Sequence, residues 1–297
     1  MPQKEYEKCT LCARNCGVDR SRAVGFCRMN DELVISRAAL HHWEEPPISG
    51  TRGSGAIFFT GCSLGCVFCQ NRRISSGRNG KAVTVERLAD IMLDLQTDGA
   101  HNINLVTPTH FVPSVKDAID TAREGGLNIP IVYNTGSYDS RETLDSLNGY
   151  VNIYLPDFKY FLPKTAKKYS SAEDYPSVAK AAIEKMVEQV GAPKFDSEGI
   201  MTSGVIVRIL LLPSHVAEAK LALKYLHDTY GDKIYVSLMN QYTPMEGMQK
   251  PLDRRVSREE YRSLVEYAER IGLKNGFTQE FGTAKESFIP EFDLTGV

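Results

Sequence analysis

The seven cysteines are the residues of this chain whose types and spacing say most about chemistry. All seven fall within the first 69 of 297 residues, and the remaining 228 residues contain none. They form a group of four and then a group of three, Cys9, Cys12, Cys16 and Cys27, followed by Cys62, Cys66 and Cys69. A disulfide framework would leave one thiol over, whereas a four-ligand site and a three-ligand site use every thiol. The spacing therefore predicts two metal sites.

The group of three lies in Gly-Cys62-Ser-Leu-Gly-Cys66-Val-Phe-Cys69-Gln-Asn, directly after a short apolar run that is typical of a strand. Spacings of three and two residues let one loop direct three thiolates at a single metal centre, as in iron–sulfur proteins. A [4Fe–4S] cluster has four irons, so three protein ligands leave one iron open. The alternative is a zinc site completed by a histidine, for which His41 and His42 are the nearest in sequence.

The group of four has the compact spacing C-x2-C-x3-C-x10-C. A structural zinc ion with closed tetrahedral coordination fits these four thiolates, and so does an auxiliary iron–sulfur cluster. Residues 1–45 have little apolar periodicity apart from these cysteines. We therefore expect a small four-cysteine metal-binding module at 1–45, with its thiolates away from the strand ends of the rest of the chain.

Residues 46–297 alternate short apolar runs with amphipathic segments, the pattern of βα units. Strands are predicted at 56–60, 102–106, 130–133, 151–155, 205–212 and 234–239. Helices are predicted at 85–97, 112–123, 141–147, 178–190, 216–230 and 257–271. Six units are too few for a closed eight-stranded barrel. The sequence therefore predicts an α/β fold, a partial (β/α)6 TIM-like barrel with its site at the C-terminal strand ends.

Polar residues at or near the ends of these strands are the candidate cofactor-binding residues. They are Thr107, Thr109, Asn134, Thr135, Asp157, Lys159, Asn240 and Gln241, with Arg208 inside the apolar fifth strand. Because the ends of parallel strands meet at one edge of a barrel, we expect these side chains to surround the cysteine loop. His110 follows the second strand and is expected to be either a substrate contact or a surface loop residue.

The loop from Cys62 to Cys69 resembles the signature of the radical S-adenosylmethionine (SAM) superfamily. This resemblance implies that the amino and carboxylate groups of SAM chelate the open iron of a [4Fe–4S] cluster. It further implies that an electron from the cluster cleaves SAM to a 5′-deoxyadenosyl radical, which removes a hydrogen atom from the substrate. The cluster then supplies the difficult chemistry, and the protein supplies position and exclusion of water.

Within that superfamily, residues 50–245 resemble the activases of glycyl-radical enzymes and the uncharacterised proteins grouped with pyruvate formate-lyase activating enzyme. Asp157-Phe-Lys159 is similar to the Asp-Leu-Lys of the activases, and Arg208 stands in their Val-x-Arg-x4-Pro setting. The resemblance implies that Asp157 holds the carboxylate end of SAM through a cation or water. Arg208 is either a clamp on the SAM carboxylate or ribose, or a member of a structural ion pair.

The chain departs from the family pattern at two strand ends. Asn134-Thr135-Gly136 stands where the activases have Asp-Thr-Asn-Gly, which lowers the charge beside the expected cation. Residues 106–110, Val-Thr-Pro-Thr-His, replace the Gly-Gly-Glu that binds the methionine amino group in the superfamily. Thr107, Thr109 or backbone carbonyls are therefore expected to accept hydrogen bonds from that amino group.

The resemblance implies an enzyme that abstracts hydrogen from a protein or peptide, with flavodoxin or ferredoxin as its electron donor. The alternatives are a radical enzyme acting on a peptide or small molecule without an activase role, and a non-catalytic metal-binding module. The formal net charge of −2 gives no basic excess for binding nucleic acid. No apolar run is long enough to cross a membrane, and the charged N-terminal segment does not resemble a signal peptide. The expected location is the cytoplasm.

Overall fold

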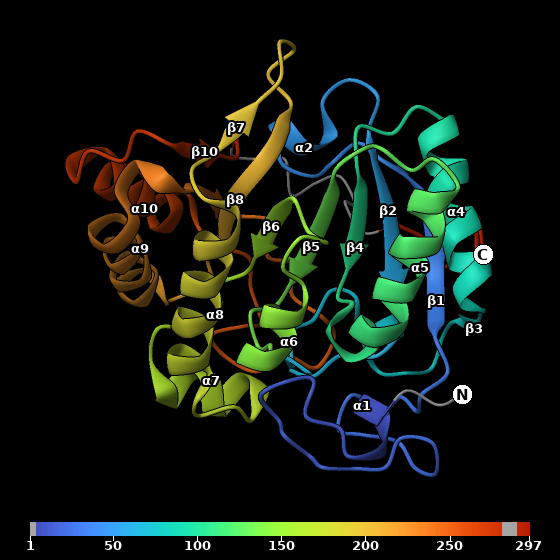
Figure 1. Cartoon of the computed structure of the whole chain (residues 1–297). Helices are drawn as coiled ribbons and strands as arrows, with labels where there is room; N and C mark the ends of the chain where they lie inside the picture. The colour runs from blue at the N-terminus through green and yellow to red at the C-terminus, as the bar shows by residue number, and fades with distance from the viewer. Residues whose placement is uncertain (1–3, 281–289) are drawn as a thin grey trace.

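The computed structural model describes residues 4–280 and 290–297, and its central feature is a single ten-stranded sheet (Figure 1). The strand order is β10-β9-β8-β6-β5-β4-β2-β1-β3, with β7 paired to β8. The strands are β1 (Val34–His41), β2 (Ser54–Phe59), β3 (Lys81–Ala82), β4 (Ile103–Val106), β5 (Ile131–Thr135), β6 (Ile153–Pro156), β7 (Lys194–Phe195), β8 (Met201–Leu210), β9 (Tyr235–Met239) and β10 (Gly276–Thr278). The strands from β2 to β10 along this order are parallel, whereas β1, β3 and β7 pair antiparallel.

The long helices follow the parallel strands and cover the outer face of the sheet (Figure 1). The helices are α1 (Lys4–Glu7), α2 (Pro46–Ser49), α3 (Arg72–Ser75), α4 (Val85–Thr97), α5 (Val112–Glu124), α6 (Arg141–Ser146), α7 (Pro163–Ser170), α8 (Tyr175–Val190), α9 (Val216–Tyr230) and α10 (Arg258–Arg270), with 3-10 turns η1 (Thr109–Phe111) and η2 (Gly231–Lys233). Thr84 and Ser140 cap α4 and α6, and Ser257 forms a capping box at α10. None of the helices in the described ranges has both the length and the apolar composition that a bilayer span requires.

The predicted partial barrel is confirmed, because the parallel strands form an open α/β sheet with helices outside it. The six predicted strands correspond to β2, β4, β5, β6, β8 and β9. The structure adds β10 as a seventh parallel strand, which the sequence did not reveal because it has only three residues. It also adds β1, which pairs antiparallel with β2. The range 1–45 predicted for the N-terminal module thus contains a strand of the main sheet.

The N-terminal end of the barrel interior is filled by apolar side chains. Ile48 of α2 packs there against inward-facing residues of the strands, Val132, Ile153, Leu155, Met201 and Ile206. Pro46 and Pro47 occupy the first positions of α2, where a missing N–H costs no helical hydrogen bond. In Figure 1, α2 lies at one end of the sheet, while the arrowheads of β4, β5 and β6 point toward the N-terminal segment at the other end. We call this cluster around Ile48 the apolar plug. Because it fills the N-terminal end, a polar site is expected at the C-terminal end of the barrel.

Candidate functional site

A cavity of about 620 Å³ occupies the barrel interior at the C-terminal ends of the parallel strands. Its walls include the loop after β2 and the last residues of β4, β5, β8 and β9. The predicted site residues that line it are Cys62, Cys66, Cys69, Thr107, Thr109, Asn134, Thr135, Asp157, Lys159, Arg208 and Gln241. This volume lies within the range of about 300–1,000 Å³ that small-molecule and cofactor sites occupy.

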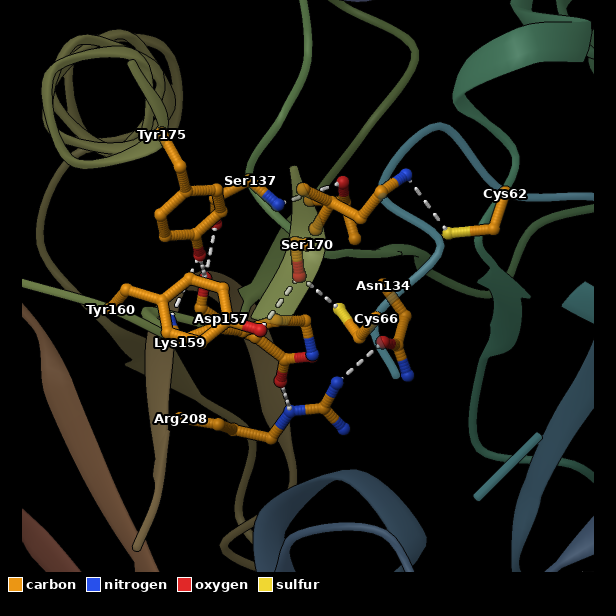
Figure 2. Close-up of polar contacts among 12 residues, drawn as sticks. Cys62, Cys66, Asn134, Ser137, Asp157, Lys159, Tyr160, Ser170, Tyr175 and Arg208 are labelled. Atoms are coloured by element: carbon orange, nitrogen blue, oxygen red, sulfur yellow. Dashed lines mark hydrogen bonds and ion pairs between the residues drawn. The ribbon is translucent and has the colours of Figure 1, made fainter. Parts of the chain in front are cut away.

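The three cysteines after β2 are half-buried in the cavity wall. The sulfur atoms of Cys62 and Cys66 accept hydrogen bonds. The Leu64 N–H donates to Cys62 Sγ at 3.4 Å, and the Ser170 hydroxyl donates to Cys66 Sγ at 3.0 Å (Figure 2). Hydrogen bonds to sulfur are among the features that tune an iron–sulfur centre. The loop and the end of α7 therefore bring candidate ligands together with groups that would support a cluster.

Gly61 lets the cysteine loop pass close to the N-terminal segment. Its φ is +90°, which favours glycine, and a side chain there would collide with Met29 and with the Cys27 carbonyl. Cys62, the first cysteine of the loop, is thus placed by a backbone conformation that only glycine adopts easily. The Cys62 N–H then donates to the Cys27 carbonyl at 3.4 Å.

The chemistry of the three thiols fits a metal centre. Burial raises the pKa of Cys62, and burial with the neighbouring thiols raises the pKa of Cys69 to about 12. Thiolates in such a place need a compensating cation, which a cluster would supply. Across residues 4–280 and 290–297, no three His, Cys, Asp or Glu side chains form a ready-made site for a single metal ion. Metal binding at either cysteine group would therefore draw its thiols together.

A network of ion pairs and hydrogen bonds forms the polar wall of the cavity. Arg208 Nε lies 2.7 Å from Asp157 Oδ1, and Lys159 Nζ lies 2.6 Å from Asp157 Oδ2 (Figure 2). The Arg208 guanidinium also donates to Asn134 Oδ1 at 2.7 Å and contacts Glu44 Oε2 at 3.3 Å. Burial by itself would raise the pKa of Asp157, but the charges of Arg208 and Lys159 outweigh it and hold that pKa below its usual value. Arg208 is thus an ion-pair member that also faces the cavity.

The backbone of Asp157 is held from two sides. The hydroxyls of Ser137 and Tyr175 both donate to the Asp157 carbonyl, at 2.7 Å and 2.8 Å, and the Lys159 N–H donates to the Tyr175 oxygen at 2.9 Å (Figure 2). The Asp157 backbone also bridges to Arg208 of β8. These contacts fix the two charged side chains after β6 in orientations that a mobile loop would not hold.

Several predicted site residues have structural partners. Thr109 and Thr135 both line the cavity, and their hydroxyls donate to Asp139 at 2.7 Å. Gln241 accepts from the Gln279 side chain at 3.0 Å. Asn240 does not line the cavity; it is buried, and its side-chain atoms have no hydrogen-bond partner among the described residues.

His110 is neither exposed nor in the cavity wall, contrary to both expectations for it. It is 1% exposed, and its Nε2 lies 2.7 Å from the Thr60 carbonyl. Burial is the main cause that lowers its pKa to about 3, so the ring is neutral at physiological pH. His110 therefore supports the strand that precedes the cysteine loop.

The sequence interpretation missed two carboxylates, Glu44 and Glu45, which enter the cavity from the segment between β1 and α2. Glu44 Oε1 accepts from the amides of Asn104 and Asn134 at 3.1 Å and 3.2 Å. Burial raises the pKa of Glu45 to about 7, although the Arg208 charge opposes this. One signal could have found them. It is an acidic pair directly before a Pro-Pro helix start, in a chain that lacks the usual glutamate after β4.

We predict that Glu45→Gln changes stability in a pH-dependent way. The folded state keeps a proton on Glu45 between about pH 4.5 and 7 that the unfolded state releases, so this carboxyl destabilises the fold increasingly as pH rises through that window. The variant should match the wild type near pH 4 and be more stable by about 3 kcal/mol at pH 8. Denaturant unfolding at both pH values measures this. A stability difference that is the same at pH 4 and pH 8 would show that Glu45 is not buried as described.

The four-cysteine segment lies against the cysteine loop and the end of β5, not away from the strand ends as expected. The Ala13 N–H donates to the Tyr138 carbonyl at 3.1 Å, and Cys12 forms an isolated β-bridge with Asp139. The segment folds back on the cysteine loop, and the Cys62 N–H donates to the Cys27 carbonyl. Sequence periodicity could not show this, because the contacts are between backbones far apart in the chain.

Arg20 gives independent support for a metal–thiolate centre in this segment. Its side chain is fully buried, donates to the carbonyls of Asn30 and His110, and lies 3.9 Å from Cys9 Sγ. No acidic side chain in the part of the chain that the structure describes pairs with it. A buried guanidinium without an anion is costly, and four metal-bound thiolates would provide the missing negative charge.

Comparisons with known proteins place this chain beside similar sequences and folds. The uncharacterized protein MJ0674 of Methanocaldococcus jannaschii is 29% identical over 279 residues, covering 90% of this chain and 76% of that protein. Among solved structures, Streptococcus suis SuiB bound to SAM is similar with a TM-score of 0.50 and 14% identity, over 74% of this chain and 48% of SuiB. SuiB bound to its precursor peptide SuiA gives a TM-score of 0.52 and 13% identity, over 75% of this chain and 48% of SuiB.

The chain spans about half the length of SuiB, and at this identity the likeness shows a shared fold. The family model described as the radical SAM superfamily matches residues 56–205, which extend from β2 through the cysteine loop, Asn134, Asp157 and Lys159 to the first half of β8, short of Arg208. That match covers half of the 297 residues, and the chain belongs to the radical SAM superfamily.

Proposed function

We propose that the protein reductively cleaves SAM at a [4Fe–4S] cluster held by Cys62, Cys66 and Cys69, and takes a hydrogen atom from a peptide or protein. The observation that carries this proposal is the placement of three half-buried thiols in the wall of a cavity that the polar wall also lines. When bound, the cluster supplies one electron, which splits SAM into methionine and a 5′-deoxyadenosyl radical. Hydrogen transfer from the substrate then gives 5′-deoxyadenosine and a substrate radical. The electron would come from a donor such as flavodoxin or ferredoxin.

The residues of the polar wall have the chemistry needed to hold SAM. The guanidinium of Arg208 and the ammonium of Lys159 suit the methionine carboxylate, and Asp157 would act through a cation or water. Thr107 and Asn134 offer neutral hydrogen-bonding groups at the ends of β4 and β5. Because the apolar plug around Ile48 closes the N-terminal end, these groups would act in a site shielded from water on that side.

Two observations bear on the substrate. SuiB, which shares the fold, has been seen with a precursor peptide, and this supports a peptide substrate. The cavity volume, in contrast, favours a small molecule as the second candidate, because the space must also receive SAM and the cluster. An activase role requires a peptide loop to enter this cavity.

Deuterium transfer distinguishes the two candidates. The reconstituted, reduced protein would be incubated with SAM and with either the protein fraction or the small-molecule fraction of cells grown in heavy water. We expect deuterium in the 5′-deoxyadenosine only with the protein fraction, and the loss of this signal after protease digestion to short fragments would indicate a folded partner. Deuterium only from the small-molecule fraction would replace the peptide proposal by its alternative.

We also propose that Cys9, Cys12, Cys16 and Cys27 hold a second metal centre, either zinc or an iron–sulfur cluster, for which the buried Arg20 supplies the support. A chain with Cys62, Cys66 and Cys69 all replaced by alanine should still contain about one equivalent of this centre. The reason is that metal binding in small thiolate sites contributes about 10 kcal/mol or more of folding free energy. Metal and sulfide analysis of the purified variant measures it: zinc alone indicates a structural ion, and iron with sulfide indicates an auxiliary cluster. A folded variant without metal would contradict the proposal.

A further inference from the structure

Arg14 ties the four-cysteine segment to the cysteine loop and to α7 at the same time. Its Nε donates to the Ser63 carbonyl at 2.8 Å, and its Nη2 donates to the Leu64 carbonyl at 3.2 Å. The same guanidinium donates to the carbonyls of Ser170 at 2.7 Å and Ser171 at 2.5 Å. One side chain therefore holds two segments that are more than 100 residues apart in sequence.

Both of these segments touch a proposed cluster ligand. Ser63 and Leu64 lie between Cys62 and Cys66, so their carbonyls belong to the ligand loop itself. Ser170 ends α7, and its hydroxyl makes the 3.0 Å hydrogen bond to Cys66 Sγ (Figure 2). Arg14 thus fixes the distance between a ligand sulfur and the donor that hydrogen-bonds to it.

The position of Arg14 depends in turn on the four-cysteine segment. It lies between Cys12 and Cys16, and its guanidinium packs over the Phe26 ring at 3.9 Å and the Tyr138 ring at 5.1 Å. A metal at Cys12 and Cys16 would fix the backbone on both sides of Arg14. Metal loading of the N-terminal centre and order in the ligand loop are then linked through this residue.

The charge of Arg14 acts in the same direction as its hydrogen bonds. The guanidinium donates to four carbonyl oxygens, and no carboxylate in the described ranges forms an ion pair with it. A positive charge beside an iron–sulfur cluster favours the reduced form, which carries one more negative charge. Hydrogen bonds to the sulfur ligands have the same effect.

We propose that Arg14 is a positioning residue that couples the N-terminal metal centre to the loop of the radical cluster and raises the reduction potential of that cluster. The inference rests on the proposed function for the identity of the cluster, and on the proposed metal centre at Cys9, Cys12, Cys16 and Cys27 for the coupling. It names a role for the four-cysteine segment beyond folding: the segment sets how readily the cluster accepts its electron.

The test is a redox titration of the full chain after anaerobic reconstitution, with no SAM or substrate present. Arg14→Met removes the charge and all four hydrogen bonds. At a fixed potential, the ratio of reduced to oxidised cluster should fall about tenfold, which is 59 mV for one electron. In Arg14→Lys, which keeps the charge, the ratio of reduced to oxidised cluster should fall less. Arg22→Met is the matched control, because Arg22 is an exposed arginine of the same segment, and it should behave as the wild type.

Each outcome decides the proposal. A wild-type ratio in Arg14→Met, or an equal shift in Arg22→Met, would overturn it. If Arg14→Met fails to hold iron, Arg14→Lys decides: a retained cluster with a lowered ratio supports the proposal, and a wild-type ratio overturns it. Because no SAM is used, a chain that fails to cleave SAM would refute the proposed function without changing this result.

Discussion

Replacing any one of Cys62, Cys66 and Cys69 by alanine should abolish formation of 5′-deoxyadenosine from SAM. Three thiolates leave a single iron of a [4Fe–4S] cluster open. Two thiolates would leave two irons without a protein ligand, and the cluster would not be held. The expected loss is at least about a thousandfold, to the background without protein. Anaerobic assays of each reconstituted variant with dithionite and SAM, with iron and sulfide measured on the same samples, provide the measurement.

Val67→Ala is the matched control for this loop. Val67 lies between two of the ligands and is 40% exposed, and only its backbone N–H is used, donating to the Tyr169 carbonyl at 2.9 Å. The control should therefore retain both the cluster and the activity. A cysteine variant that turns over SAM at the rate of Val67→Ala would remove that cysteine from the proposed ligands.

Arg208→Ala should weaken both the fold and the binding of SAM. The guanidinium is 12% exposed, and its loss leaves Glu44 and Asp157 without a shared cation. Breaking one partner of a buried pair costs about 3–5 kcal/mol, and the remaining bond of Asp157 to Lys159 places this case near 3 kcal/mol. The loss of a charged hydrogen bond to the SAM carboxylate should lower affinity by roughly one to two orders of magnitude. Denaturant unfolding and calorimetric titration of the reconstituted protein give the two values.

Two further variants separate these effects. Arg262→Ala removes an exposed arginine whose helical pair with Glu266 spans 3.7 Å, and it should change stability by less than about 0.5 kcal/mol and leave SAM binding unchanged. Asp157→Asn should reduce SAM affinity less than Arg208→Ala, and by an amount that varies with the monovalent cation present. If Arg208→Ala loses stability but binds SAM like the wild type, Arg208 is a structural ion-pair member and the carboxylate end of SAM lies elsewhere.

The parts of the site that could be predicted are those where chemistry follows directly from local sequence. Cys62, Cys66 and Cys69 are close in the chain, so their convergence needs only one loop. Asp157 and Arg208 are far apart in sequence, but Asp157 directly follows β6 and Arg208 lies in the neighbouring parallel strand β8. Parallel pairing brings the ends of such strands together whatever the rest of the chain does.

The parts that could not be predicted depend on contacts between segments that no periodicity relates. Glu44 reaches the cavity because β1 pairs antiparallel with β2, and the segment between β1 and α2 then forms part of the cavity wall. Arg14 reaches the cysteine loop because the N-terminal segment packs on it through backbone carbonyls, which carry no sequence signal. Asn240 differs from the other predicted residues because it follows β9 but is buried and does not line the cavity.

Reductive cleavage of SAM by the unaltered protein is the measurement that tests the central claim most directly. The chain would be reconstituted with iron and sulfide under anaerobic conditions, reduced, and given SAM, and both 5′-deoxyadenosine and methionine would be quantified over time. The account predicts that the two products form in equal amounts, only with reductant and only with the cluster present. A protein that holds a [4Fe–4S] cluster at Cys62, Cys66 and Cys69, is reduced, and leaves SAM intact would contradict it.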